Sequence, residues 1–233
     1  MAVFQRARSE EQREARRQAI LGAAASMLAE MPVAEVTLNE LSRRAGLAKS
    51  NVLRYFESRE AVLLELLDSA WQDWLAELDL AVPGDTPGRA GPVAERADRV
   101  ALALAASLAA RPMLCDLLSA QAAVLERNVS PQVAAQYKRA SIAGITALGG
   151  LLLRRVPELG EHDAFQLAGA AIMMTGALWP HTQPSAAMLA AYAAEPELAA
   201  MRLDFTATLG EVLQVMTAGL LARSRHWPAE RAR

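Results

Sequence analysis

Cysteine, aromatic residues and long apolar runs are all scarce in this chain, and each scarcity excludes a class of protein. The single cysteine, Cys115, excludes an internal disulfide framework and a cysteine-based zinc site. Aromatic residues make up 5% of the 233 residues and β-branched runs are nearly absent, which favours helices. The longest apolar run, residues 100–110, is too short to span a bilayer, and residues 1–18 contain no apolar signal core. We therefore expect a cytoplasmic protein with no membrane partner.

A strong net charge is also lacking. The formal net charge is -2, which argues against non-specific coating of nucleic acids. The charge is unevenly spread, because residues 1–60 contain ten Lys/Arg and eight Asp/Glu, whereas residues 61–233 contain fourteen and eighteen. The basic excess lies near the N-terminus and supports a nucleic-acid partner there.

Alanine and leucine are abundant, and their spacing predicts helices throughout. Ser9 with Gln12, and Thr37 with Glu40, form capping-box patterns, and Ser58 can cap a later helix. Three prolines and three glycines predict a loop over residues 82–92, and no strand pattern is apparent. The predicted fold is all-α, with helices at 9–30, 38–45, 49–55, 59–80, 93–110, 113–126, 131–156, 162–179, 185–193 and 201–225.

The most informative stretch is residues 37–63, which read TLNELSRRAGLAKSNVLRYFESREAVL. Leu38, Leu41 and Ala45 lie on one face of a helix. Gly46 follows and permits the positive φ of a tight turn. This pattern indicates a helix-turn-helix, a unit that places its second helix in the major groove of DNA.

The polar residues in and around this motif suit contacts with bases and phosphates. Asn reads adenine and Arg reads guanine through paired hydrogen bonds, while Lys and Ser donate to either kind of group and the hydroxyl of Tyr55 suits a phosphate. The alternative is an ordinary three-helix piece with a solvated polar face. The combination of cap, apolar spacing, glycine turn, polar helix and aromatic stop favours DNA reading. The predicted DNA-binding residues are Thr37, Arg44, Lys49, Ser50, Asn51, Arg54, Tyr55 and Arg59.

Residues 20–67 resemble the N-terminal DNA-binding domain of the TetR family of transcriptional regulators. The resemblance rests on ILGAAASMLAE, on the block VTLNELSRRAGLAKSNVLRYFESREAVL, and on Tyr55-Phe56 followed by Ser58-Arg59-Glu60. Leu53-Arg54 replaces the family's more usual second aromatic position and its neighbour, and Arg59 stands where Lys is frequent. The resemblance implies a homodimer with an all-helical C-terminal domain that binds a small ligand. It also implies that ligand binding moves the helix after Ser58.

We expect a helix-turn-helix domain over residues 1–57, a larger helical effector-binding and dimerisation domain over 58–225, and a flexible tail over 226–233. The helices at 162–179 and 201–225 are expected to form the dimer interface, the alternative being burial within one subunit. Low polar content favours a small hydrophobic or amphipathic effector. Family analogy and composition select Trp74, Met113, Leu117, Gln121 and Tyr137 as ligand-binding residues, although such residues are more often plain core.

The sequence thus predicts a ligand-responsive, homodimeric transcriptional regulator, most often a repressor, that binds a palindromic double-stranded DNA operator through its helix-turn-helix. The alternative is a helical small-molecule-binding or partner-binding module without specific DNA readout. An enzyme is not expected, because His162, His181 and His226 are too scattered for a metal site and Cys115 has no nearby His. No catalytic residue, metal or cofactor is predicted.

Overall fold

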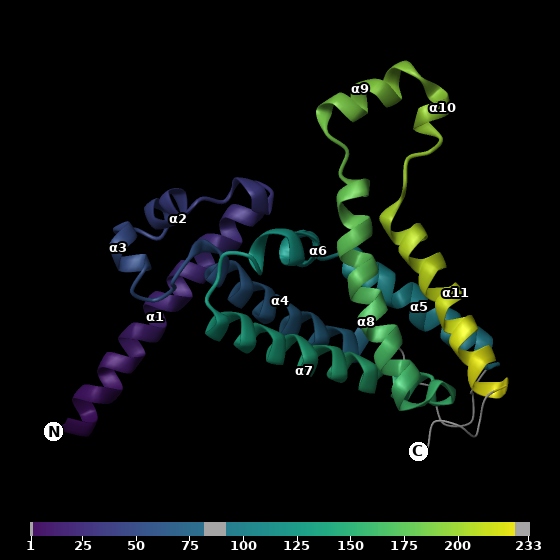
Figure 1. Cartoon of the computed structure of the whole chain (residues 1–233), viewed down its shortest axis with the longest axis horizontal. Coiled ribbons are helices and arrows are strands. Elements are labelled where there is room, and N and C mark those ends of the chain that lie inside the picture. The colour runs from purple at the N-terminus through teal and green to yellow at the C-terminus, as the bar shows by residue number, and fades with distance from the viewer. Residues whose placement is uncertain (1, 82–91, 227–233) are drawn as a thin grey trace. The chain divides into compact units, whose positions relative to one another are not determined.

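The structure is a computed structural model that describes residues 2–81 and 92–226 (Figure 1). These residues form helices joined by turns, and no strand occurs among them, so the fold is all-α as predicted. The chain divides into two compact units. Unit 1 comprises residues 1–70 and 120–139, and unit 2 comprises residues 71–119 and 140–233. Helices α4 (Arg59–Ala81) and α7 (Pro131–Arg155) each contribute residues to both units.

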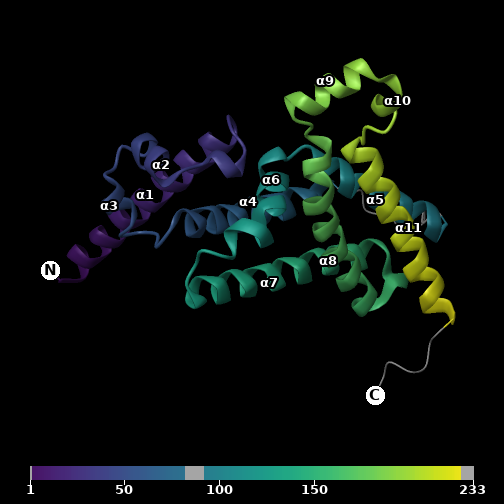
Figure 2. The ribbon, with the colours of Figure 1, turned by 45° about the horizontal axis from the view of Figure 1, so that its top comes forward.

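Unit 1 is built on the long helix α1 (Ala2–Leu28), beside which α2 and α3 lie in both views (Figures 1 and 2). Ile20, Met27, Leu41, Val52 and Leu63 have no exposed surface and form its core. Burial of each such side chain stabilises the unit by roughly 1.5–3 kcal/mol. Its other elements are η1 (Val33–Glu35), α2 (Leu38–Arg44), α3 (Lys49–Val52), the first half of α4, η2 (Gln121–Leu125) and the start of α7.

Unit 2 is an apolar helical body in which α11 packs along α5 and then against α8. Leu104, Leu108 and Leu209 are buried at these contacts. Small residues bring its helices close together, since a Cβ on Gly176 of α8 would lie 2.9 Å from the carbonyl oxygen of Leu118. Its further elements are α5 (Val93–Ala109), α6 (Pro112–Ala120), η3 (Pro157–Leu159), α8 (Gly160–Leu178), η4 (Trp179–Thr182) and α11 (Phe205–His226).

Two short helices, α9 (Ala186–Ala194) and α10 (Pro196–Ala199), form an arm between α8 and α11 (Figure 2). The arm contains no buried residue. Its apolar side chains Met188, Leu189 and Met201 are exposed by 45%, 46% and 77%. Helices this short gain little stability by themselves. At the start of α9, the Ser185 hydroxyl oxygen accepts the N–H of Met188 and caps the helix.

Besides the end of α3, three predicted helix boundaries are wrong, each for a local reason, and one helix was missed. α1 begins at Ala2 and not at Ser9, because residues 2–8 include no helix breaker. α6 ends at Ala120, where the chain widens into the π-helical turn η2 instead of continuing to residue 126. α11 begins at Phe205 and not at residue 201, because the Asp204 carboxylate accepts the N–H of Ala207 at 2.7 Å and caps the helix. The helix α10 was not predicted.

Two predicted segments lie outside the described residues. These are the loop over 82–92, of which only Pro92 is described, and the tail, of which only His226 is described. Pro92 occupies the position before the first residue of α5. The loop predicted over residues 82–91 and the flexible tail predicted over residues 227–233 therefore stay predictions.

Candidate nucleic-acid interface

The position of α2 follows from its cap and from the turn behind it. The Thr37 hydroxyl oxygen accepts the N–H of Glu40 at 3.2 Å, as the sequence predicts. Gly46 adopts a φ of +66°, a conformation that favours glycine, and its N–H donates to the Arg43 carbonyl at 3.2 Å. The glycine therefore ends α2 and redirects the chain toward α3.

Helix α3 is one turn long and ends at Val52, three residues before the predicted end at Tyr55. The N–H groups of Arg54 and Tyr55 donate to the carbonyls of Asn51 and Val52 at 3.2 and 2.9 Å. These bonds close tight turns three residues long, where an α-helix would span four. The chain turns early because Phe56, which is 5% exposed, enters the core directly after Tyr55.

Four of the residues predicted to bind DNA lie within this short helix or directly after it. Lys49, Ser50 and Arg54 are exposed, and Asn51 is half-buried, while Val52 anchors the helix from its inner side. Among residues 10–78 and 92–223, no hydrogen bond or ion pair occupies the side chains of these four residues. Their donors are therefore available to a partner outside the described part of the chain.

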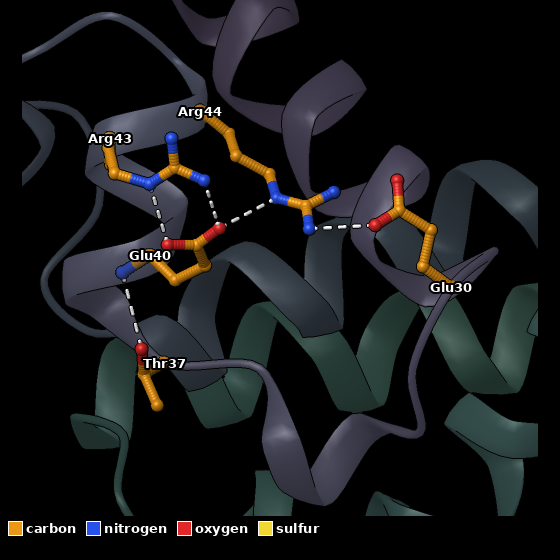
Figure 3. A network of polar contacts seen from close by, with 5 residues as sticks. All are labelled: Glu30, Thr37, Glu40, Arg43 and Arg44. Atoms are coloured by element: carbon orange, nitrogen blue, oxygen red, sulfur yellow. Dashed lines mark hydrogen bonds and ion pairs between the residues drawn. The ribbon is translucent and has the colours of Figure 1, made fainter.

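Arg44, predicted to bind DNA, lies within an ion-pair network that joins α2 to Glu30 (Figure 3). Its guanidinium donates to Glu40 at 2.9 Å and to Glu30, beyond the end of α1, at 2.7 Å. Arg43 donates to the same Glu40 carboxylate at 2.8 and 2.6 Å. Hydrogen bonds from Arg43 and then Arg44 lower the pKa of Glu40 to about 2. The Glu40 carboxylate thus accepts hydrogen bonds from Arg43 and Arg44 (Figure 3). In a complete capping box it would accept the backbone N–H of Thr37.

Arg59 and Thr37, predicted to anchor phosphates, differ in availability. The Arg59 guanidinium donates to the Val36 carbonyl at 2.7 Å and pairs with Glu60 at 2.9 Å. It therefore fastens the start of α4 to the segment before α2. Thr37 is exposed, and its hydroxyl oxygen serves as an acceptor within the cap, which leaves its O–H as a donor.

Tyr55 shares a cleft with residues that the sequence reasoning missed. The cleft has a volume of about 370 Å³ and is lined by Gln12, Arg13 and Arg16 of α1 together with Arg54 and Tyr55. The helical spacing of Gln12, Arg13 and Arg16 was visible in the sequence, but nothing there placed α1 beside α3. The predicted and missed residues therefore meet on one surface of unit 1.

Three of the predicted ligand-binding residues lie in unit 2 and are largely core. Trp74 and Leu117 have no exposed surface, and Met113 is half-buried. The Trp74 indole N–H donates to the Ser107 hydroxyl at 3.1 Å. An apolar void of about 10 Å³ between α5, α7, α8 and α11 is lined by none of the three. This void holds one water molecule at most, whereas ligand pockets usually measure 300–1,000 Å³.

The other two, Gln121 and Tyr137, lie in unit 1. The Gln121 amide donates to the Glu126 carboxylate at 2.8 Å, and the Lys138 ammonium donates to the same carboxylate at 2.8 Å. Burial opposes ionisation of Glu126, but these two hydrogen bonds outweigh it and lower its pKa. Tyr137 is 8% exposed. The five predicted residues are therefore divided between the two units.

A second tryptophan, Trp71, has a property that Trp74 lacks. Its indole N–H is buried and has no hydrogen-bond partner among the described residues. The ring meets Trp74 edge to face, with 5.2 Å between ring centroids. A Cβ on Gly144 of α7 would lie 2.3 Å from the Trp71 Nε1 atom, so α7 approaches the indole closely. The sequence carried no signal for this contact, because Gly144 is one of several glycines in apolar helices.

Cys115 is a structural residue of unit 2. Its side chain has no exposed surface, and its Sγ atom lies 3.3 Å from the Leu108 carbonyl oxygen. Burial, and then the charge of Asp116, raise the pKa of the thiol to about 12. The thiol is therefore protonated at neutral pH and is a poor nucleophile.

Comparison with known families matches both parts of the chain. Residues 20–66 match the model of bacterial regulatory proteins of the tetR family, and residues 68–224 match that of the Tetracyclin repressor-like C-terminal domain. The chain belongs to the TetR family. It is therefore a transcriptional regulator with a DNA-binding helix-turn-helix, and its class is not one of enzymes.

Known regulators resemble this TetR-family chain either over a short stretch of sequence or in fold. It is 42% identical to the HTH-type transcriptional regulator EthR of Mycobacterium tuberculosis over 50 residues, which are 22% of this chain and 23% of EthR. A TetR transcriptional regulator from Rhodococcus sp. RHA1 has a similar fold, with 15% identity, a TM-score of 0.55 and coverage of 89% of this chain and 96% of that one. FadR from Bacillus subtilis, solved in complex with stearoyl-CoA, also has a similar fold, with 15% identity and a TM-score of 0.53. The match covers 87% of this chain and 98% of that one.

Proposed function

We propose that this TetR-family protein is a homodimeric, ligand-responsive repressor that reads a palindromic DNA operator with α2 and α3. The observation that carries the proposal is a set of side-chain donors in and after α3, on Lys49, Ser50, Asn51 and Arg54, that have no partner among residues 10–78 and 92–223. Asn51 and Arg54 are proposed to read base edges, and Lys49 and Ser50 to contact bases or phosphates. Thr37 and Tyr55 supply further phosphate donors. Arg44 and Arg59 hold α2, α3 and the start of α4, which we call the reading head, together through their internal contacts.

A homodimer is supported by apolar surface on α8 and α11. Phe165, Met173 and Val215 are exposed by 43%, 71% and 67%. Only a third of the apolar stretch Phe205–Arg223, with a mean hydropathy of 1.3, is buried within the chain. A stretch of this length and composition suits a membrane span or a helix packed against protein, and a regulator of DNA requires the latter. Two reading heads 34–36 Å apart would then meet successive major grooves.

Response to an effector requires a connection between the effector domain, proposed to begin at residue 58, and the reading head. Helices α4 and α7 both carry residues of each unit. Within unit 1, the Glu57 carboxylate accepts the N–H of Ser130, directly before α7, at 2.5 Å. A shift of α7 would therefore act on the segment that follows α3. The apolar interior of unit 2 favours a hydrophobic or amphipathic effector.

Selection of binding sites from random duplex DNA tests the reading head, and light scattering tests the dimer. We expect a palindromic consensus and a mass twice that of one chain. Met173→Glu should give monomers, whereas Ile142→Glu, at a position 58% exposed on α7, should not. Binding that is salt-sensitive but blind to sequence would instead support a helical module without specific readout.

Transcription in vitro from a promoter that carries the selected site tests the sign of regulation and the effector class. We expect the protein to lower transcript yield. Stearate and stearoyl-CoA are suitable first probes, since the similarly folded FadR was solved with the latter. Release of DNA by either probe would support an amphipathic effector, whereas activation of the promoter would contradict the repressor assignment.

A further inference from the structure

The cleft between α1 and the turn after α3 contains three arginines that have no counter-ion among the described side chains of unit 1. Arg13, Arg16 and Arg54 line it together with Gln12 and Tyr55. All three arginines are exposed, and no acidic side chain among residues 10–78 and 92–223 pairs with them. Three guanidinium groups around one cleft repel each other unless an anion lies among them. The chemistry of the cleft is therefore that of an anion site.

The neighbouring arginine, Arg17, shows what a structural arginine does on the same helix. Its guanidinium donates to the Tyr55 carbonyl at 3.0 Å, pairs with Glu65 of α4, and lies 4.5 Å from the centre of the Phe56 ring. These contacts fix the wall of the cleft that carries Tyr55. Arg13 and Arg16, four and one residues earlier, have no such partners among residues 10–78 and 92–223. The same helix carries the acidic residues Glu10, Glu11 and Glu14, and Glu14 accepts a hydrogen bond from the Gln18 amide at 2.8 Å.

We propose that this cleft binds adjacent phosphate groups of the DNA backbone, with Arg13 and Arg16 each contacting one of them beside Arg54. The proposal rests on the proposed function, because it takes duplex DNA as the partner. Arg54 belongs to the reading head, so a strand held by α3 continues past α1. Guanidinium groups bind phosphate oxygens through paired hydrogen bonds, and the Tyr55 and Gln12 side chains add neutral donors. Helix α1 thereby extends the DNA-binding surface beyond the helix-turn-helix.

The salt dependence of DNA binding tests the site, because each phosphate contact releases counter-ions. The double variant Arg13→Ala/Arg16→Ala is compared with wild type by fluorescence anisotropy on the selected duplex and on an unrelated duplex. The negative slope of log affinity against log salt should become shallower by about 1.8 when two phosphate contacts are lost. Affinity at 0.1 M salt should fall roughly 10- to 60-fold. The loss should be the same on both duplexes, since phosphates carry no sequence information.

Two control variants separate charge from fold. Arg13→Lys/Arg16→Lys should keep the wild-type slope, and Arg202→Ala, at an exposed site of unit 2, should change neither slope nor affinity. Circular dichroism should be unchanged in all variants. A double alanine variant with the wild-type slope, or one that loses affinity for the selected duplex alone, would overturn the phosphate site and leave the proposed function intact. A wild-type protein that selects no consensus would overturn the proposed function while the slope still reports on the cleft.

Discussion

The two units hold their helices in different ways. Unit 1 positions its short helices with polar contacts, such as the Thr37 cap, the network around Glu40, and the bond from Arg59 to the Val36 carbonyl. Unit 2 also contains ion pairs, such as those of Arg111 with Glu77 and Arg223 with Asp163, but its helices approach each other closely through apolar packing at Gly144 and Gly176. Polar contacts fix direction at modest energy, because exposed pairs contribute about 1 kcal/mol or less. Close packing carries stability and tolerates little change in volume. The unit that binds DNA and the close-packed helical unit thus depend on different kinds of side-chain contact.

The largest change in free energy, a loss of DNA-binding affinity, should come from residues that neither unit uses for its own stability. Asn51→Ala and Arg54→Ala should each weaken binding to the selected operator by about 1–3 kcal/mol, because each removes a base or phosphate contact. Thermal unfolding should not change, since neither side chain has a hydrogen bond within the described part of the chain. Anisotropy titrations measure the loss, and Arg99→Ala in unit 2 is the control. Full, salt-resistant affinity in the double variant would show that α3 is not the reading helix.

The close packing of unit 2 can be broken with one methyl group. Gly144→Ala should destabilise the protein by about 1–3 kcal/mol, because its Cβ would lie 2.3 Å from the Trp71 Nε1 atom in a rigid, buried ring. Gly150→Ala on the same helix is the matched control. The nearest atom to its Cβ is Arg154 Nη1 at 3.8 Å, so the better helix propensity of alanine should stabilise the protein by about 0.5–1 kcal/mol. Urea unfolding compares them, and equal signs for the two variants would contradict the packing described for α7.

The difference between the units also explains what the sequence could predict. The Thr37 cap, the Gly46 turn and the apolar face that contains the buried Leu41 were all predicted, because each depends on residues a few positions apart. The exposed polar residues of α3 were predicted for the same reason. The length of α3 was not, because it depends on where Phe56 meets the core.

Contacts between distant segments were the main omission. Arg44 and Arg59 have side chains suited to DNA, but in the fold Arg44 donates to Glu30 and Arg59 donates to the Val36 carbonyl. It could not place Arg13 beside Arg54, 41 residues later, or Gly144 against Trp71. In unit 2 the helices were predicted from composition, yet their packing depends on which small residues face each other. Residue types repeat too often there to reveal such pairs.

A cap should matter only where its helix carries core residues. Thr37→Ala should destabilise the protein by about 1 kcal/mol, because the cap supports α2, whose Leu41 is fully buried. Ser185→Ala removes a similar bond, from the Met188 N–H to the serine oxygen at 3.3 Å, on α9, which buries no residue. It should leave global unfolding unchanged. Hydrogen exchange should show faster local opening of α2 in the first variant and of α9 in the second. A shared loss of global stability would mean that the arm is part of the folded core.

The smallest effect should come from the ion-pair network, and it depends on pH. Hydrogen bonds from Arg43 and Arg44 lower the pKa of Glu40 from 4.5 to about 2 in the folded protein. A lowered pKa in the folded state means that Glu40 contributes stability above about pH 4.5 and loses it as the pH falls toward 2. Glu40→Gln should therefore unfold at a lower temperature than wild type near neutral pH, and the two proteins should converge in acid.

Glu35→Gln is the matched control for this comparison, because Glu35 is exposed and pairs with no residue in the described part of the chain. Its melting temperature should follow that of wild type across the whole pH range. Salt should also reduce the difference between wild type and Glu40→Gln, since exposed pairs are screened. Curves for Glu40→Gln that ran parallel to wild type at every pH would mean that the network contributes no pH-dependent stability. The position of α2 would then depend on the Thr37 cap and the burial of Leu41 alone.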